Sequence, residues 1–391
     1  MQKTLLAAAL LAGLATAGVA QAESSVTLYG IADAGYGYSQ YKLNDHNINL
    51  KKTSSGLLGG SLAGNRFGLR GSEDLGNGLR AVFTLEQGFD IGSGAPADDK
   101  RQFSRQAFVG VASDSWGTFT MGRQYDAGVD AGIVENGDGT NGFNLGDMDK
   151  AFGSTGMNGG TRIDNSFKYT TPSMAGFKAI FLYGTGGNGN TTIFRNGNDD
   201  AKDTNRGNHG SVGLVYANGP LSVGASYTRE NRGETTTGDF GGSSFTKDAV
   251  TNWNIGAAYD FEVVKLSLAY GRDLHGKLGM GMDTADYLGQ DLNIENYSDF
   301  KSNNYHVGLS APLAGGVLYA GWNRSTSNLD AAQADGGWGD LAGNINTYHV
   351  NYQYPLSKRT TVYVYGSYAQ NLGYVDGLKG KEAGLGMLHA F

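Results

Sequence analysis

The sequence predicts an all-β fold: a sixteen-stranded antiparallel transmembrane β-barrel with up-and-down topology. Segments in which apolar and polar residues alternate recur along the whole chain, and tight and long connections alternate between them. Beyond the N-terminus, no apolar run approaches the roughly 20 residues that a membrane-spanning helix needs. The 391 residues include 64 glycines, 22 tyrosines and no cysteine, and the formal net charge is −7. So many aromatic residues are not typical of a disordered chain.

The N-terminus has the pattern of a secretory signal peptide. Lys3 is followed by an apolar core from Leu5 to Val19 and then by Ala20-Gln21-Ala22, an A-x-A cleavage site. The alternative is a membrane anchor, but the apolar core is short for a spanning helix. We therefore expect residues 1–22 to be removed and residues 23–391 to form a single barrel domain.

The expected strands show a two-residue period. In residues 25–38, for example, Val26 and Leu28 lie on one face while Thr27 and Tyr29 lie on the other. Helical periodicity is not evident outside the signal peptide. Sixteen such segments are expected, near residues 25–38, 64–73, 78–90, 102–112, 116–124, 163–171, 175–184, 209–217, 219–229, 250–261, 263–273, 302–312, 314–325, 344–355, 357–370 and 380–391.

The connections between these segments are of two kinds. Short ones have turn composition, at residues 73–78, 113–116, 172–176, 217–220 and 312–316. Long ones are rich in Gly, Asn, Asp and Ser, at residues 39–63, 91–101, 125–162, 185–208, 230–249, 274–301 and 326–343. Their alternation predicts a sheet with turns at one rim and loops at the other.

The stretch RFGLRG decides between a soluble sandwich and a barrel. Alternation places Phe67 and Leu69 on one face and Arg66 and Arg70 on the other, which fits either architecture. No helix is expected to cover the apolar faces, and an open sheet this long would expose unpaired edges. In lipid, closure is obligatory because unpaired backbone groups there are costly. The even strand number and the two rims favour a membrane barrel with a water-filled lumen.

The chain ends inside a strand. EAGLGMLHAF alternates Ala383, Leu385, Met387 and His389 and stops on Phe391. One interpretation is an ordinary last strand. The other, which we favour, is that the terminal aromatic residue is an assembly signal read by the machinery that inserts such barrels.

Other chemistry receives little support from the sequence. GTGGNG at residues 184–189 matches G-x-G-x-x-G, but the helix that a dinucleotide site needs does not follow. The six histidines show no metal spacing, no nucleophile–base pair is discernible, and the acidic balance argues against nucleic-acid binding. We expect no catalytic residues, no metal and no cofactor.

Several motifs carry a family resemblance over essentially the whole mature chain. They are SSVTLYGIADAG, NRFGLRGSEDLGNGLRAVFTLEQGF, RQAFVGV, WGTFTMGRQYD, NSFKYTTPSMAGF and LHAF. With them the chain resembles the general porins of Gram-negative outer membranes, in particular the porin type of β-proteobacteria such as Burkholderia, Bordetella and Neisseria. The resemblance implies a homotrimer of sixteen-stranded barrels whose third long loop folds into the lumen.

The resemblance also implies where the pore narrows. The third loop corresponds to residues 126–160, with the acidic residues Asp126, Asp130, Glu135, Asp138, Asp147 and Asp149; it lacks the Pro-Glu-Phe-Gly-Gly motif of enteric porins. The basic residues facing it would be Arg66, Arg70, Arg105, Arg123 and Arg162. Alternation independently places Arg66 and Arg70 on the polar face, whereas both faces around Arg105 are mostly apolar. Ordinary solvation of the lumen wall is the alternative role for these arginines.

The function expected from this family is passive diffusion of small hydrophilic solutes and ions across the outer membrane. The implied partners are two further copies of the chain, outer-membrane lipid and lipopolysaccharide, and the insertion machinery during assembly. Two alternatives remain: a substrate-specific channel on the same barrel, and, from a different class, an exported β-rich adhesin or lectin.

Overall fold

The computed structural model describes residues 24–45, 48–133, 162–185, 208–231, 249–276, 300–328 and 343–391. The predicted signal peptide therefore lies outside the described residues. The strands of the single sheet are β1 (Ser24–Asp45), β2 (Ile48–Gly59), β3 (Arg66–Gly76), β4 (Leu79–Gly88), β5 (Gln106–Ser113), β6 (Gly117–Tyr125), β7 (Arg162–Thr170), β8 (Phe177–Gly184), β9 (Asn208–Asn218), β10 (Leu221–Asn231), β11 (Val250–Asp260), β12 (Lys265–Leu274), β13 (Lys301–Leu313), β14 (Gly316–Ser327), β15 (Asn344–Pro355), β16 (Thr360–Gln370) and β17 (Lys379–Ala390). In the part of the chain that the structure describes, two short helices accompany them, α2 (Ala127–Asp130) and η3 (Leu372–Tyr374).

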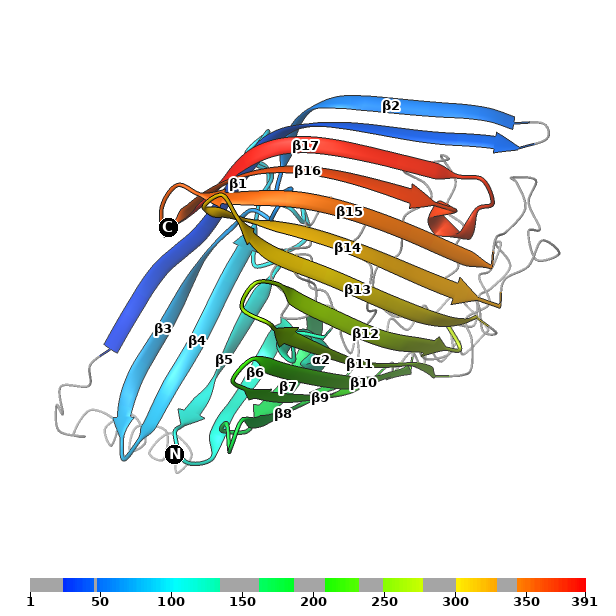
Figure 1. Cartoon of the computed structure of the whole chain (residues 1–391). Coiled ribbons are helices and arrows are strands. Elements are labelled where there is room, and N and C mark those ends of the chain that lie inside the picture. The colour runs from blue at the N-terminus through cyan, green and yellow to red at the C-terminus, as the bar shows by residue number, and fades with distance from the viewer. Residues whose placement is uncertain are drawn as a thin grey trace, which may run out of the picture.

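The sheet is a closed barrel with sixteen strand positions. From β3 to β17 each strand pairs antiparallel with the next, and β17 pairs with β1 in a register that runs from Ile31↔Ala390 to Lys42↔Lys379. Figure 1 shows the red last strand beside the blue first strand. The predicted fold class is confirmed.

Seventeen labels fill sixteen positions because the second position is split. β2 pairs with residues 34–45 of β1, and β3 pairs with residues 24–31 on the same side. The expectation that residues 39–63 form a long loop is therefore wrong for most of that stretch. Its polar composition suggested a loop. In a membrane barrel, however, one face of each strand lines the aqueous lumen, so a strand can contain many polar residues.

The split in the second position is held from inside the barrel. Asp33 is fully buried, and its carboxylate accepts hydrogen bonds from the backbone N–H groups of Leu62 (2.6 Å) and Ala63 (2.9 Å) and from the Tyr363 hydroxyl (2.5 Å). The side-chain oxygen of Asn65 accepts from the Asp33 N–H at 2.5 Å. Residues 60–65 thus turn inward at a fixed place, just before the strand that carries Arg66.

The two faces of the barrel are inverted relative to a soluble protein. Large apolar side chains are exposed on the outside, among them Phe67 (45% exposed), Leu69, Val109, Leu268 and Leu385. Polar side chains are buried on the inside, among them Asn252, Asn254, Ser267, Asn304 and His306. The predicted alternation of RFGLRG is confirmed, since Phe67 and Leu69 lie on the outer face. Apolar side chains are stable there because the outer face contacts lipid and not water.

The short connections lie together at one rim. In the turn between β3 and β4, Gly76, Asn77 and Gly78 all have positive φ, and the Asp74 carboxylate accepts the Gly76 N–H at 2.8 Å. Residues other than Gly or Asn would strain the backbone at these left-handed positions. The rim of short turns is the periplasmic one in outer-membrane barrels.

Within the described part of the chain, no helix is both long and apolar enough to span a bilayer.

Candidate functional site

A cluster of arginines occupies the inner wall at β3 to β7, and Glu86 of β4 is its first anchor. Its side chain is 5% exposed and accepts from Arg105 Nε at 2.8 Å, while Arg66 Nε lies 4.0 Å away. The Tyr29 hydroxyl donates to the other carboxylate oxygen at 2.9 Å. Two guanidinium groups therefore share one buried carboxylate.

Tyr125, the last residue of β6, joins the next arginine to this group. Its hydroxyl oxygen accepts from Arg105 Nη2 at 2.8 Å and from Arg162 Nη2 at 3.1 Å. The Arg162 guanidinium also lies over the Tyr125 ring, 4.8 Å from the ring centre. A phenol that accepts from two cations offsets part of their mutual repulsion without cancelling either charge.

Asp164 of β7 is the second acidic anchor. It pairs with Arg123 Nη1 at 2.5 Å and with Arg101 Nη2 at 3.0 Å. Arg123 also donates from Nε to the Ser104 carbonyl at 2.8 Å. This guanidinium is fixed in direction by contacts on two sides, which suits a group that presents charge to a lumen.

Arg70 lies four residues beyond Arg66 on β3, toward the short-turn rim. Its guanidinium stacks over the Tyr29 ring at 5.1 Å and the residue is exposed. In the described part of the chain, three carboxylates, Glu86, Asp164 and Asp98, pair with the arginines of the cluster, which are Arg66, Arg70, Arg101, Arg105, Arg123 and Arg162. Among the described residues of this wall, guanidinium groups therefore outnumber carboxylates.

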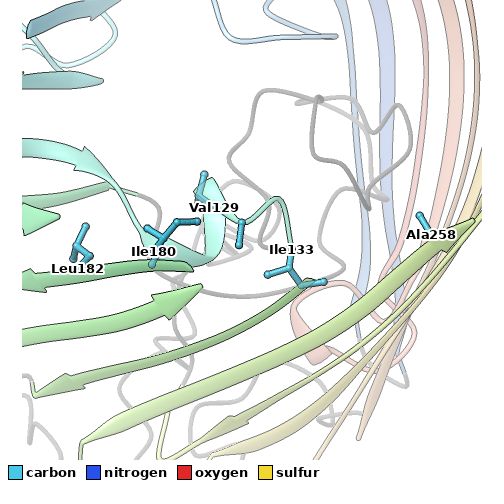
Figure 2. Packing of buried hydrophobic residues seen from close by; sticks show 7 residues of the cluster. Val129, Ile133, Ile180, Leu182 and Ala258 are labelled. Carbon is cyan, nitrogen blue, oxygen red and sulfur yellow. The ribbon is translucent and has the colours of Figure 1, made fainter. Parts of the chain in front are cut away.

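The start of the third loop enters the barrel and lies against the wall of β8 to β11. Ile133 and Val129 pack with Ile180 and Leu182 of β8 and Ala258 of β11 in one buried apolar cluster. Figure 2 shows these side chains between the loop and the strands. Ile180 and Leu182 are inward apolar residues, an exception to the polar lining, and the loop that covers them explains the exception.

The loop is fixed to the wall at its first residue. Asp126 is fully buried, caps α2 by accepting the Gly128 N–H at 2.8 Å, and pairs with His209 Nε2 of β9 at 2.7 Å. Glu230 of β10 lies 3.7 Å from the other ring nitrogen of His209. Asp126 therefore anchors the loop and presents no carboxylate to the lumen.

Of the other predicted acidic residues, the structure describes Asp130. Its carboxylate pairs with Lys168 Nζ of β7 at 2.5 Å, and its side chain is 31% exposed. Glu135, Asp138, Asp147 and Asp149 lie outside the described residues.

The five predicted arginines share one wall, but the sequence did not reveal what holds them. Glu86, Tyr29 and Asp164 were missed as anchors, and Arg101 and Tyr125 as members. Alternation did place Glu86 on the polar face of its strand. Only the register, in which Arg66 lies opposite Gly88 and Glu86 opposite Gln106, brings Glu86 between two arginines from neighbouring strands.

The terminal Phe391 lies at the closing seam of the barrel. Its backbone N–H donates to the Gly30 carbonyl at 3.0 Å, and its carbonyl accepts the Gly30 N–H at 3.0 Å. Its ring is 45% exposed on the outer surface. No cluster of three or more His, Cys, Asp or Glu residues that could hold a metal occurs among the described residues.

Comparison with known proteins gives a consistent result over the full length. A family described as Gram-negative porin matches residues 7–374. An outer membrane porin protein of Bordetella pertussis is 38% identical over 417 aligned positions, covering 100% of both chains.

Among solved structures, an anion-selective porin from Comamonas acidovorans has a TM-score of 0.65 at 22% identity, covering 94% of this chain and 100% of that one. A trimer form of OmpT from Vibrio cholerae has a TM-score of 0.56 at 17% identity, covering 94% and 99%. These comparisons give no support to an exported adhesin or lectin.

Proposed function

The chain belongs to the Gram-negative porin family, and from that premise we propose how its channel selects solutes. The protein is an integral β-barrel of the outer membrane, and small hydrophilic solutes and ions cross its water-filled lumen by passive diffusion. The lumen lets a polar solute avoid the cost of entering hydrocarbon. We propose that it catalyses no reaction, because diffusion through an open lumen needs no chemical step.

The proposed selectivity filter is the arginine cluster, Arg66, Arg70, Arg105, Arg123 and Arg162, facing the third loop. The observation that carries it is the excess of guanidinium groups over carboxylates among the described residues of this part of the wall. Fixed positive charges beside low-dielectric protein attract anions and repel cations. We therefore propose that the channel prefers anions, as the related porin from Comamonas acidovorans is described to do.

For the acidic side of the filter we propose fewer loop carboxylates than the sequence suggested. Among the described residues, Asp130, which pairs with Lys168, is the loop carboxylate that we assign to this side. Glu135, Asp147 and Asp149 belong to the same proposal from sequence alone. Asp126 is assigned to anchoring instead, because it is buried against His209. Opposed charges would set up a transverse field in which polar solutes align and apolar solutes gain nothing.

Replacing Arg66 and Arg70 by alanine tests the filter. We expect the zero-current potential of the purified protein in a planar bilayer, measured across a KCl gradient, to shift toward cation preference. Replacing Lys178, which lies on β8 outside the cluster, by alanine is the control for loss of a positive charge elsewhere, and we expect a smaller shift. An unchanged potential in the double variant would reject the assignment.

The assembly proposed for this channel is a homotrimer. It is supported by family membership and by the trimer form of the related OmpT. Contacts with outer-membrane lipid and lipopolysaccharide, recognition of Phe391 by the insertion machinery, and removal of residues 1–22 from a single barrel domain of residues 23–391 belong to the same proposal. Single-channel recording would show three equal conductance steps, whereas single isolated steps would contradict the trimer.

A further inference from the structure

A hollow of about 440 Å³ lies in the inner wall between the arginine cluster and the short-turn rim. Strands β1 and β3 to β7 form it. Its lining includes Arg70, Thr84, Thr120, Val82, Phe108 and Ala112. It is separate from the contacts of Glu86 and Asp164 described above.

The apolar part of its lining, called the floor, is formed by Val82, Phe108 and Ala112, whereas most of the lumen wall is polar. Val82 is two residues from Thr84 on β4 and shares its inward face. Phe108 lies opposite Thr84 on β5, and Ala112 lies opposite Arg80, so both point the same way. The sequence showed that both faces around Arg105, just before β5, are mostly apolar. The structure shows that the inward apolar residues Phe108 and Ala112 of β5 line this hollow.

These inward apolar residues have a different setting from those of β8. Ile180 and Leu182 are covered by the start of the third loop. Val82 and Phe108 belong to none of the apolar clusters formed by the described residues, and both are only half-buried. An apolar surface beside a water-filled lumen is a place where a solute can bury hydrocarbon.

Arg70 supplies a positive charge at the edge of this floor. Its guanidinium lies over the Tyr29 ring, 5.1 Å from the ring centre, and no carboxylate among the described residues pairs with it. Lys168, on the opposite side of the hollow, is compensated by Asp130 at 2.5 Å. The hydroxyls of Thr84, Thr118 and Thr170 add hydrogen-bond donors. Arg70 therefore gives the hollow a net charge of +1 among its described lining residues, which suits a monoanion.

We propose that this hollow is a transit-binding site for small organic monocarboxylates that carry an apolar body, with aryl carboxylates as the best fit. The Arg70 guanidinium binds the carboxylate through its planar fork, and Phe108 and Val82 contact the hydrocarbon. Binding is weak, since a conducting site must also release its solute. This inference rests on the channel function and deepens it by naming a solute class.

The test compares three probes as blockers of single-channel KCl current: benzoate, acetate and benzyl alcohol. Benzoate is expected to halve the current at a concentration roughly tenfold below that of acetate, because its ring buries additional hydrocarbon. Benzyl alcohol, which has the ring but no charge, is expected to have little effect. Equal block by benzoate and acetate, or by benzoate and benzyl alcohol, would overturn the proposal.

Variants separate the two halves of the site. Phe108→Ala should raise the half-blocking concentration of benzoate toward that of acetate, and Arg70→Gln should weaken block by both. Phe119→Ala, the same change on the outer face of β6, is the matched control and should leave benzoate block unchanged. Should Phe108→Ala not assemble, Val82→Thr makes the same test on the neighbouring strand.

The outcomes keep the two proposals apart. If conductance steps persist but Phe108→Ala and Val82→Thr leave benzoate block unaltered, the carboxylate site is refuted and the channel stands. If the wild-type protein gives no conductance steps, the channel function itself is refuted.

Discussion

Glu86 is the residue on which the arginine cluster depends, although it carries the opposite charge. Its carboxylate lies between Arg66 and Arg105 and also accepts from Tyr29. A cluster of guanidinium groups without a counter-charge would repel itself. One buried carboxylate lowers that repulsion, and guanidinium groups still outnumber carboxylates among the described residues of the wall.

Replacing Glu86 by glutamine removes this negative charge with little change of shape. We expect the ratio of Cl⁻ to K⁺ permeability to rise by a factor on the order of two, because the local field becomes more positive. The zero-current potential in a KCl gradient measures it. Glu73→Gln, at the short-turn rim outside the cluster, is the control, and a shift of equal size in both variants would contradict the assignment.

At the scale of elements, the root of the third loop is fixed by steric fit as well as by charge. A Cβ atom on Gly213 of β9 would collide with the Ala127 carbonyl oxygen, and then with the Ala131 side chain. Glycine is therefore required for the backbone of α2 to approach the strand. Asp126 and His209 add the ion pair at the same place.

The variant Gly213→Ala should displace the start of the loop from the wall. Because the start of the loop lies inside the barrel against the wall, we expect its displacement to change the open cross-section, with a higher single-channel conductance and entry of larger neutral polymers in an exclusion assay. Gly210→Ala lies three residues away, where an added Cβ meets nothing within 4 Å. If both variants conduct like the wild type, the close approach is not what holds the loop.

The split between β2 and β3 shows what a sequence pattern misses at this scale. Alternation located β3 within two residues of its observed start, but residues 48–59 looked like a loop. Strand formation there comes from pairing with the extended β1, a long-range contact that local composition does not encode. The inward turn at 60–65 likewise depends on Asp33, about thirty residues earlier.

At the scale of the whole molecule, closure depends on the seam between β17 and β1. Phe391 and Gly30 exchange two backbone hydrogen bonds, and the phenyl ring lies where a Cβ on Gly30 would be. Removing Phe391 should forfeit both bonds, at about 1 kcal/mol each, and expose an edge. We expect less folded, heat-modifiable oligomer on electrophoresis, whereas Phe391→Tyr should retain it; equal yields would argue against the role of the terminal residue.

The inverted faces of the barrel give a second test at this scale. The chain contains no cysteine, so single cysteines report their own environment. Leu268→Cys, at a half-exposed outer position, should react with a lipid-confined reagent, and Ser267→Cys, at a buried inner position, should not. Similar lipid-side labelling at both sites would be inconsistent with the barrel.

Sequence patterns were enough to predict the fold class, the strand positions apart from the split, the two rims, and which side of RFGLRG meets lipid. These follow from a two-residue period, which is a local property of the chain. Three features became visible in the folded barrel alone: Glu86 and Asp164 anchor the arginines, Asp126 holds the loop instead of facing the lumen, and Phe108 and Arg70 border one hollow. Those contacts join residues from different strands, and strand register, which sets them, is fixed by the closure of the whole sheet.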